Sequence, residues 1–184
     1  MKKLFFVLLL LNLSFTVSSQ ETTNDEKPTI FERKHEVRLG AIKLLAGPIF
    51  EGSYEYIVSS NQGFGAYALV NLDSSNDWFE NYSLTPYYRM YFQTNEDYGA
   101  KGFFVEGFTS FFSSDFDFNL EDEINGQENN DDVFDISIGL SLGKKWINTS
   151  GFVFEFKIGA GRNLLGNADS DAIIKGDFYI GYRF

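Results

Sequence analysis

Residues 174–184 read IKGDFYIGYRF, and their side chains alternate between two kinds. Every second residue, from Ile174 to Phe184, is apolar or glycine, and three of these residues are aromatic. The residues between them include Lys175 and Asp177, so the other face carries both signs of charge. Because successive side chains of a β-strand point to opposite faces, this period of two predicts a strand that continues to Phe184. A half-buried strand of a soluble protein could alternate in the same way.

Seven further segments upstream have the same kind of pattern, and most have about the 9–11 residues of a tilted membrane-spanning strand. In residues 133–146, for example, Phe134 and Ile136 alternate with Asp135 and Ser137. The pattern predicts an all-β fold, an eight-stranded antiparallel up-and-down transmembrane β-barrel. The eight expected strands are residues 36–46, 49–58, 63–72, 82–93, 101–113, 133–146, 151–162 and 174–184.

Two of the expected strands contain irregular positions. Arg38 and Lys43 lie on opposite faces if residues 36–46 form one strand, so we expect either a bulge or a Lys43 side chain that reaches back to the rim. Pro86 lies in the middle of residues 82–93 and lacks a backbone N–H, which predicts a bulge or a local distortion of that strand.

The charged faces decide between a soluble and a membrane barrel. A soluble barrel such as a lipocalin turns its apolar face inward, whereas a membrane barrel turns it toward lipid. On the predicted polar faces acidic and basic residues nearly balance, although the whole chain has a net charge of −11. Balance is expected if these charges pair inside a narrow barrel, where an unpaired charge is costly. The predicted interior charge network consists of Arg38, Glu55, Arg89, Glu106, Asp135, Glu155, Lys157, Lys175, Asp177 and Arg183.

Residues 1–19 have the features of a cleaved secretion signal. Two lysines precede an apolar run at residues 4–11, and residues 17–19 are suited to cleavage. The run is far shorter than the roughly 20 apolar residues of a membrane-spanning helix, which argues against a helical anchor. We therefore expect export to the cell outer membrane, with a flexible periplasmic lead-in at residues 20–35 and a barrel domain at residues 36–184.

The composition narrows the functional classes. The 184 residues fit one domain, and the absence of cysteine excludes disulfides and thiolate metal sites. The acidic net charge of −11 argues against nucleic-acid binding. The single histidine, His35, precedes the expected barrel, which argues against a histidine-based metal site or a Ser–His catalytic pair. We predict no catalytic residue, no metal ligand and no cofactor.

The connections between the expected strands differ in length. Those after the third, fifth and seventh strands are long, and those after the second and sixth are short, as in barrels with extracellular loops and periplasmic turns. The connection at residues 114–132 is acidic and contains no lysine or arginine. It could bind an extracellular ligand or Ca²⁺, although it lacks the spacing of an EF-hand, or it could lie solvated among lipopolysaccharide. Its acidic residues are Asp115, Asp117, Glu121, Asp122, Glu123, Glu128, Asp131 and Asp132.

Several motifs together resemble a known family. They are EVRLGAIKLL at 36–45, SYEYIV at 53–58, LTPYYRMYF at 84–92, GFFVEGF at 102–108, GKKW at 143–146, GFVFEFKIGAGRN at 151–163 and GYRF at 181–184. This ordered set resembles the small outer-membrane β-barrel proteins of Bacteroidota type, a domain of unknown function. The resemblance implies a barrel like those of OmpA and OmpX, and it implies no activity.

The last segment also resembles the closing strand of outer-membrane barrels. In those proteins an aromatic final residue, with tyrosine two places before it, belongs to a signal that the barrel-assembly machinery reads. The residues that match this insertion signal are Phe178, Ile180, Tyr182 and Phe184.

Three functions are compatible with such a barrel. A structural or adhesive role through the acidic loops needs only a folded anchor, and we expect it for a monomer among outer-membrane lipids and lipopolysaccharide. A narrow channel or small-ligand transporter is the first alternative. It is disfavoured because eight strands enclose little space and five aromatic residues are predicted to point inward, namely Tyr67, Tyr87, Tyr91, Phe104 and Phe108.

A lipid-modifying enzyme is the second alternative. Without a histidine in the barrel, its acid and base would have to be a carboxylate pair such as Glu106 and Glu155. Pairing with basic residues inside the barrel explains these two carboxylates better, so we expect no enzymatic activity.

Overall fold

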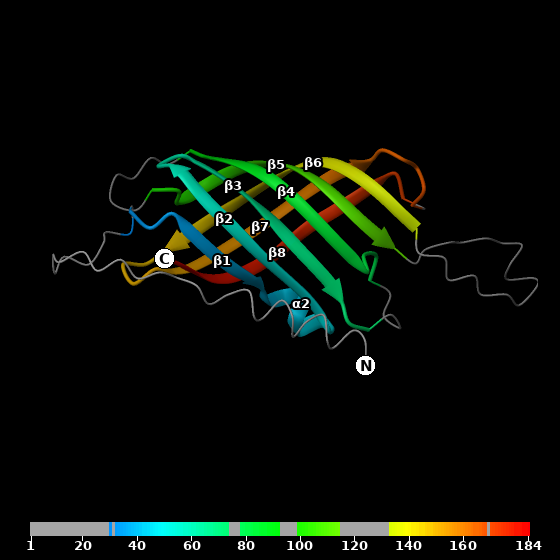
Figure 1. Ribbon diagram of the computed structural model, residues 1–184, viewed down its shortest axis with the longest axis horizontal. Helices are drawn as coiled ribbons and strands as arrows, with labels where there is room; N and C mark the ends of the chain where they lie inside the picture. The colour runs from blue at the N-terminus through cyan, green and yellow to red at the C-terminus, as the bar shows by residue number, and fades with distance from the viewer. Residues whose placement is uncertain (1–29, 31, 74–77, 93–98, 115–132, 169) are drawn as a thin grey trace, which may run out of the picture.

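The computed structural model describes residue 30 and residues 32–73, 78–92, 99–114, 133–168 and 170–184. These residues form a closed barrel of eight antiparallel strands, in which each strand pairs with its neighbours in the sequence and β8 pairs with β1 (Figure 1). The predicted eight-stranded antiparallel up-and-down barrel is therefore confirmed. The strands are β1 (His35–Gly40), β2 (Ile49–Ser59), β3 (Gln62–Asn71), β4 (Tyr82–Tyr91), β5 (Gly102–Ser114), β6 (Val133–Ile147), β7 (Phe152–Asn163) and β8 (Ala172–Arg183).

The prediction of a single strand at residues 36–46 is wrong in its second half. β1 ends at Gly40, and a short helix, α2 (Ala41–Ala46), follows it before β2 begins. The carboxylate of Asp177 on β8 accepts hydrogen bonds from the backbone N–H groups of Ile42 and Lys43, at 2.8 and 3.3 Å. A contact with the far end of the chain therefore holds the first turn of α2.

The helix also resolves the conflict between Arg38 and Lys43. Both side chains are buried, because the change from strand to helix changes the side-chain period between them. Neither the expected bulge nor a lysine that reaches back to the rim is needed.

Pro86 interrupts the pairing of β4 with β5. The register is the same on both sides of it, but the pairing lapses at Thr85 and Pro86. The expected distortion is thus a gap in the hydrogen-bond ladder and not a bulge, in keeping with the missing N–H of proline. A side-chain hydrogen bond of 2.8 Å between Thr85 and Ser110 spans the gap.

The barrel has a turn end and a loop end, which lie at the left and the right of Figure 1. The turn end contains the ends of β2, β4, β6 and β8 and the starts of β1, β3, β5 and β7. The loop end contains α2, the ends of β1, β3, β5 and β7 and the starts of β2, β4, β6 and β8.

Some sequence predictions concern residues outside those described. The expected signal peptide, residues 1–19, lies wholly outside them. Of the expected lead-in, residues 20–35, residues 20–29 and residue 31 also lie outside them. The acidic residues of the 114–132 connection, from Asp115 to Asp132, also lie outside the described ranges.

The barrel wall separates apolar side chains outside from charged side chains inside. Leu140 and Phe103 on the outside are 65% and 58% exposed, whereas Arg89 and Glu106 on the inside are fully buried. Among the described residues, eight carboxylates and seven basic side chains are buried. This distribution is the reverse of a soluble barrel with an apolar interior. In the described parts of the chain, no helix has the length and apolar character to cross a membrane.

Aromatic side chains fill the space around the buried charges. One cluster lies toward the turn end, one lies in the middle of the barrel, and a third, around Phe112, lies toward the loop end. The interior of the described barrel is thus occupied by side chains, as expected for eight strands. The five aromatic residues predicted to face inward are all buried there, namely Tyr67, Tyr87, Tyr91, Phe104 and Phe108.

Candidate functional site

Arg89 on β4 lies at the centre of the buried charges. Its guanidinium nitrogens lie 3.0 Å from a carboxylate oxygen of Glu55, 2.6 Å from one of Glu106 and 2.7 Å from one of Glu155. The same group lies 3.8 Å from the ring centroid of Phe104, which packs against it. Three strands besides β4 therefore converge on one cation that is fully removed from solvent.

Arg38 on β1 binds two of the same carboxylates. It pairs with Glu155 and, at 3.0 Å, with Glu55. It also donates a hydrogen bond of 2.6 Å to the hydroxyl of Tyr87. The two arginines thus share their acidic partners, and the pairs form one continuous network. In such a network each ion supports the geometry of the others.

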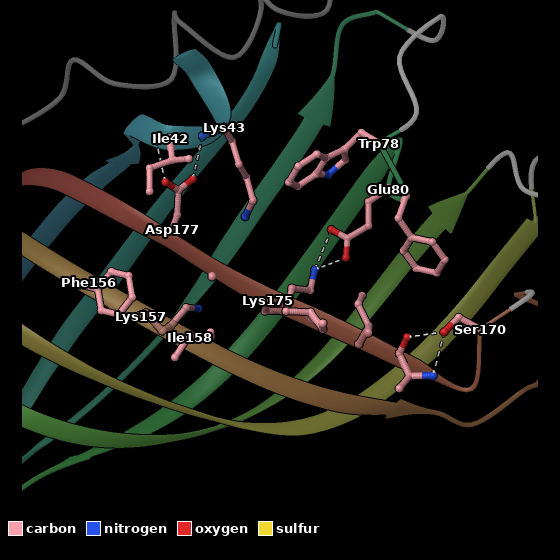
Figure 2. A pocket seen from close by; sticks show the side chains of 15 residues that line it. Ile42, Lys43, Trp78, Glu80, Phe156, Lys157, Ile158, Ser170, Lys175 and Asp177 are labelled. Carbon is pink, nitrogen blue, oxygen red and sulfur yellow. Dashed lines mark hydrogen bonds and ion pairs between the residues drawn. The ribbon is translucent and has the colours of Figure 1, made fainter. Parts of the chain in front are cut away.

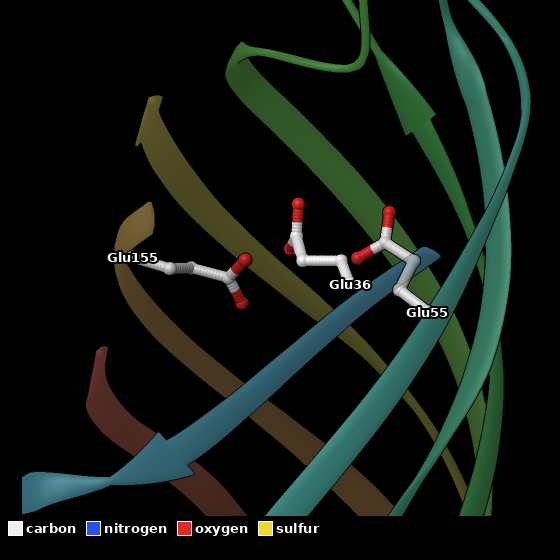
Figure 3. Close-up of side chains that lie close together, drawn as sticks. All are labelled: Glu36, Glu55 and Glu155. Atoms are coloured by element: carbon white, nitrogen blue, oxygen red, sulfur yellow. The ribbon is translucent and has the colours of Figure 1, made fainter. Parts of the chain in front are cut away.

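Three glutamates of this network, Glu36, Glu55 and Glu155, bring carboxylate oxygens within 4.8 Å of one another (Figure 3). A group of this kind can hold a metal ion, but here Lys145 provides the positive charge. Its ammonium nitrogen lies 2.7 Å from Glu36, 2.8 Å from Glu55 and 3.7 Å from Glu155. The triad is therefore compensated by protein side chains and does not call for a cation from solution.

From this compensation we expect divalent cations to leave the stability of the barrel unchanged. A refolded variant that lacks residues 115–132 should show the same thermal unfolding temperature in excess EDTA and in millimolar Ca²⁺, measured by circular dichroism. The deletion is needed because the acidic 114–132 connection could bind Ca²⁺ itself. A rise in the unfolding temperature of this variant with Ca²⁺ would contradict the compensation of the glutamate triad by Lys145.

A second group of ion pairs lies nearer the loop end. Lys157 binds Glu106 at 3.0 Å, and its ammonium lies 3.5 Å from the ring centroid of Tyr67. Lys175 pairs with Glu80 at 2.5 Å. In addition, Lys43 of α2 pairs with Glu51, whose other oxygen accepts a hydrogen bond of 2.7 Å from Tyr179. These contacts extend the charged interior from the centre of the barrel to the base of the loops.

Arg183 closes the network at the turn end. It pairs with Glu36 at 2.9 Å and donates to the carbonyl oxygens of Gly99 and Ala100 at 3.2 and 2.9 Å. Ala100 is fully buried and has a positive φ of 35°. Gly99 and Ala100, which come shortly before β5, are thus held at this end of the barrel by a buried arginine.

The structure brings eight of the ten residues predicted for the interior network into ion pairs. Asp135 and Asp177 are buried but act differently, because their carboxylates accept backbone hydrogen bonds. Asp135 accepts from the N–H groups of Leu165, Asn167 and Ala168 at 3.0–3.2 Å, which fixes the start of the connection between β7 and β8. Asp177 holds α2 as described above.

Five further members of the interior were missing from the predicted network, namely Glu36, Lys43, Glu51, Glu80 and Lys145. Glu36 lies on the same strand face as Arg38, and Lys145 lies on the same face as Asp135. Extending the period-two pattern of each strand to these positions would have included both residues. Glu51 likewise shares the parity of Glu55. Lys43 and Glu80 lie outside the strands, and no period in the sequence assigns them to the interior.

Neither carboxylate of the possible catalytic pair is free for acid–base chemistry. Glu106 and Glu155 both bind Arg89, and Glu106 also binds Lys157. A group that is held in several charge-assisted bonds is poorly placed to exchange protons with a substrate. The arrangement supports a structural use of these charges.

The residues of the predicted insertion signal lie on the outside of β8 and just beyond it. Ile180, Tyr182 and Phe184 are exposed, and Phe178 is half-buried. The backbones of Phe184 and His35 exchange hydrogen bonds of 2.8 and 3.1 Å, which completes the seam between β8 and β1 at the turn end.

Comparison with known proteins adds no relative: no family model, no curated protein and no solved structure matches the chain. The resemblance to the Bacteroidota-type family stays a prediction.

Proposed function

We propose that the protein is a monomeric outer-membrane barrel that acts as a closed anchor for extracellular loops, in a structural or interaction role and without catalysis. The observation that carries the proposal is the apolar exterior combined with an interior of paired charges. A closed barrel satisfies its backbone groups within lipid, and its outward apolar side chains match the hydrocarbon. Pairing removes most of the cost of the charges inside.

Side chains on the turn end support its placement at a membrane surface. The ammonium of Lys144 lies 4.6 Å from the ring centroid of Phe103 and 5.3 Å from that of Trp146, all on the outside of the barrel. Aromatic residues and lysines of this kind are common where a membrane barrel meets the headgroups. The turn end is then periplasmic, and the loop end with its acidic connection is extracellular. Contacts with lipopolysaccharide and the barrel-assembly machinery, and a ligand for the acidic loop, stay predictions.

A channel is less well supported than an anchor. Arg89, stacked on Phe104, and the cluster of Tyr67, Tyr87, Phe108 and Tyr179 fill the interior, and Arg183 holds Ala100 at the turn end. A diffusing solute would have to break these contacts. A wide aqueous path is a feature of barrels with more strands.

We expect the refolded barrel domain to be heat-modifiable and closed to ions. In detergent micelles, samples that have not been boiled should migrate differently in electrophoresis from boiled samples, with a β-type far-ultraviolet spectrum. In planar bilayers, the inserted protein should give no discrete conductance steps. The physical reason is that the folded barrel is stable in micelles and its interior is filled.

Two results would contradict this proposal in different ways. A β-rich protein that stays monomeric in water without detergent would place the apolar face in contact with solvent and refute membrane insertion. Regular conductance steps from a heat-modifiable protein would keep the membrane barrel and replace the anchor with a channel.

A further inference from the structure

The lapse in the pairing of β4 with β5 leaves one backbone carbonyl without its strand partner. In an antiparallel pair, residue pairs that exchange hydrogen bonds alternate with pairs that do not. The N–H of Phe92 donates to the carbonyl of Phe103 at 2.9 Å. Continued along the register in steps of two, this alternation puts Pro86 opposite Thr109 at a bonding position. Because proline has no N–H, the carbonyl of Thr109 receives no hydrogen bond from β4.

The outer wall is hollowed at the same place. A groove of about 600 Å³ runs over β4, β5 and β6, and Thr109 is one of the residues that line it. The floor is low because Pro86 has a short side chain and Gly107 has none, whereas Ile138 and Leu140 of β6 stand exposed beside it. The volume lies within the roughly 300–1,000 Å³ of small-molecule sites.

The groove is apolar apart from this carbonyl and the threonine hydroxyl, and that combination limits what it can select. Hydrocarbon contains no water that could bond the carbonyl. On the inner side of the wall, a hydrogen bond of 2.8 Å between Thr85 and Ser110 already spans the gap, so a ligand approaches from the outer side. The chain of an ordinary phospholipid has no donor, whereas a hydroxylated acyl chain has an O–H group. The groove therefore favours an apolar chain that carries a hydroxyl.

A cavity of similar volume beside β7, β8 and α2 offers no comparable group among the described residues that line it (Figure 2). Each of its three lysines is paired with a buried glutamate: Lys43 with Glu51, Lys157 with Glu106 and Lys175 with Glu80. Its remaining carboxylate, that of Asp177, accepts hydrogen bonds from the backbone of α2. Polar selection of a ligand is thus expected at the groove and not at this cavity.

We propose that the groove over β4, β5 and β6 binds a membrane lipid with a hydroxylated acyl chain. The chain lies over Pro86 and Gly107, against Ile138 and Leu140, and its hydroxyl donates to the carbonyl of Thr109. This inference rests on the proposed function, because the groove meets acyl chains only if the outer wall lies in a membrane.

Native mass spectrometry of the refolded protein, released from detergent micelles, tests the site directly. The two probes are a phosphatidylcholine with myristoyl chains and the same lipid with β-hydroxymyristoyl chains. The protein should bind the hydroxylated lipid about threefold to tenfold more tightly, the size of one hydrogen bond within a membrane. Bound lipid is counted from the mass of each complex.

Two substitutions separate the hydrogen bond from the groove. Pro86→Ala supplies an N–H to the carbonyl of Thr109, so it should abolish the preference while both lipids still bind. Thr109→Val removes the side-chain hydroxyl but keeps the carbonyl, so the preference should remain.

A third substitution blocks the groove itself. Gly107→Leu fills the floor and should weaken the binding of both lipids at least severalfold. A Cβ atom at Gly107 meets only a methyl group of Leu140 at 3.9 Å, so the barrel has room for the new side chain. Gly52→Leu is the matched control: Gly52 lies on β2, outside the groove, and a Cβ atom there meets only the ring of Phe50 at 3.7 Å. It should leave the binding of both lipids unchanged.

The outcomes separate this proposal from the membrane anchor. If the barrel is heat-modifiable but shows no preference, or a preference that Pro86→Ala does not reduce, the lipid site is refuted and the anchor stands. A preference lost in Thr109→Val would overturn the role of the carbonyl. A dimer that Gly107→Leu dissociates would show that a second copy covers the groove and would also refute the site. If neither lipid binds and no heat-modifiable form exists, both proposals fail.

Discussion

Replacing Arg89 with alanine should lower the free energy of unfolding by about 3–5 kcal/mol, the range for removing one partner from a buried ionic network. The substitution takes away the cation that lies between Glu55, Glu106 and Glu155 and leaves these fully buried carboxylates with fewer partners. It also empties the space over the ring of Phe104. Urea unfolding of the refolded barrel, followed by tryptophan fluorescence, measures the loss.

Arg162→Ala is the matched control for this prediction. Arg162 lies on β7 and is exposed, so its replacement should change the free energy of unfolding by less than about 0.5 kcal/mol. If Arg89→Ala lowered the free energy of unfolding no more than the control does, the interior would have to contain enough water to solvate the charges. That result would favour the channel over the closed anchor.

The barrel itself could be predicted because each strand shows its two faces in its own stretch of sequence. A strand with one lipid-like face and one charged face shows a period of two in the sequence, and eight such segments of similar length account for eight strands. The same parity places Arg89 and Glu106 inside. Near-balance of charge on the polar faces then indicates pairing, before any pair is known.

The pairs themselves could not be predicted, because they depend on how the sheet closes. Lys175 meets Glu80 across 95 positions of sequence, and Arg183 meets Glu36 across 147. Such contacts follow from the stagger of the closed barrel, which no period encodes. The presence of many interior charges was predictable, whereas the identity of each partner was not.

The helix α2 was missed for a related reason. Residues 41–46 read AIKLLA, which continues an apolar pattern and has no capping residue at its start. The side chain that holds its first turn, Asp177, comes from the last strand. The early end of β1 therefore depends on a contact that the local sequence does not show.

A methyl group at Gly139 should destabilise the barrel by about 1–3 kcal/mol, the usual cost of overpacking. Gly139 lies on β6 opposite Phe108 of β5 and Gly161 of β7. A Cβ atom at this position would lie 2.5 Å from the ring of Phe108 and 2.6 Å from the Cα atom of Gly161. The backbone of β7 cannot rotate away as a side chain can, so Gly139→Ala must move a strand. Urea unfolding in micelles measures the loss.

Gly107→Ala is the matched control, since it adds the same atom to the neighbouring strand. A Cβ atom at Gly107 would have a single neighbour within 4 Å, a methyl group of Leu140 at 3.9 Å, because this position faces the outside of the wall. The free energy of unfolding of Gly107→Ala should be unchanged or higher by up to about 1 kcal/mol, because alanine at a compatible backbone position reduces the conformational entropy of the unfolded chain. Equal effects of the two substitutions would mean that the aromatic side chains inside the barrel are not packed against β6, and the argument for a filled interior would lose its basis. A loss confined to Gly139→Ala would show that the missing side chain at this position lets β7 approach β6 closely and lets the ring of Phe108 fill the interior beside them.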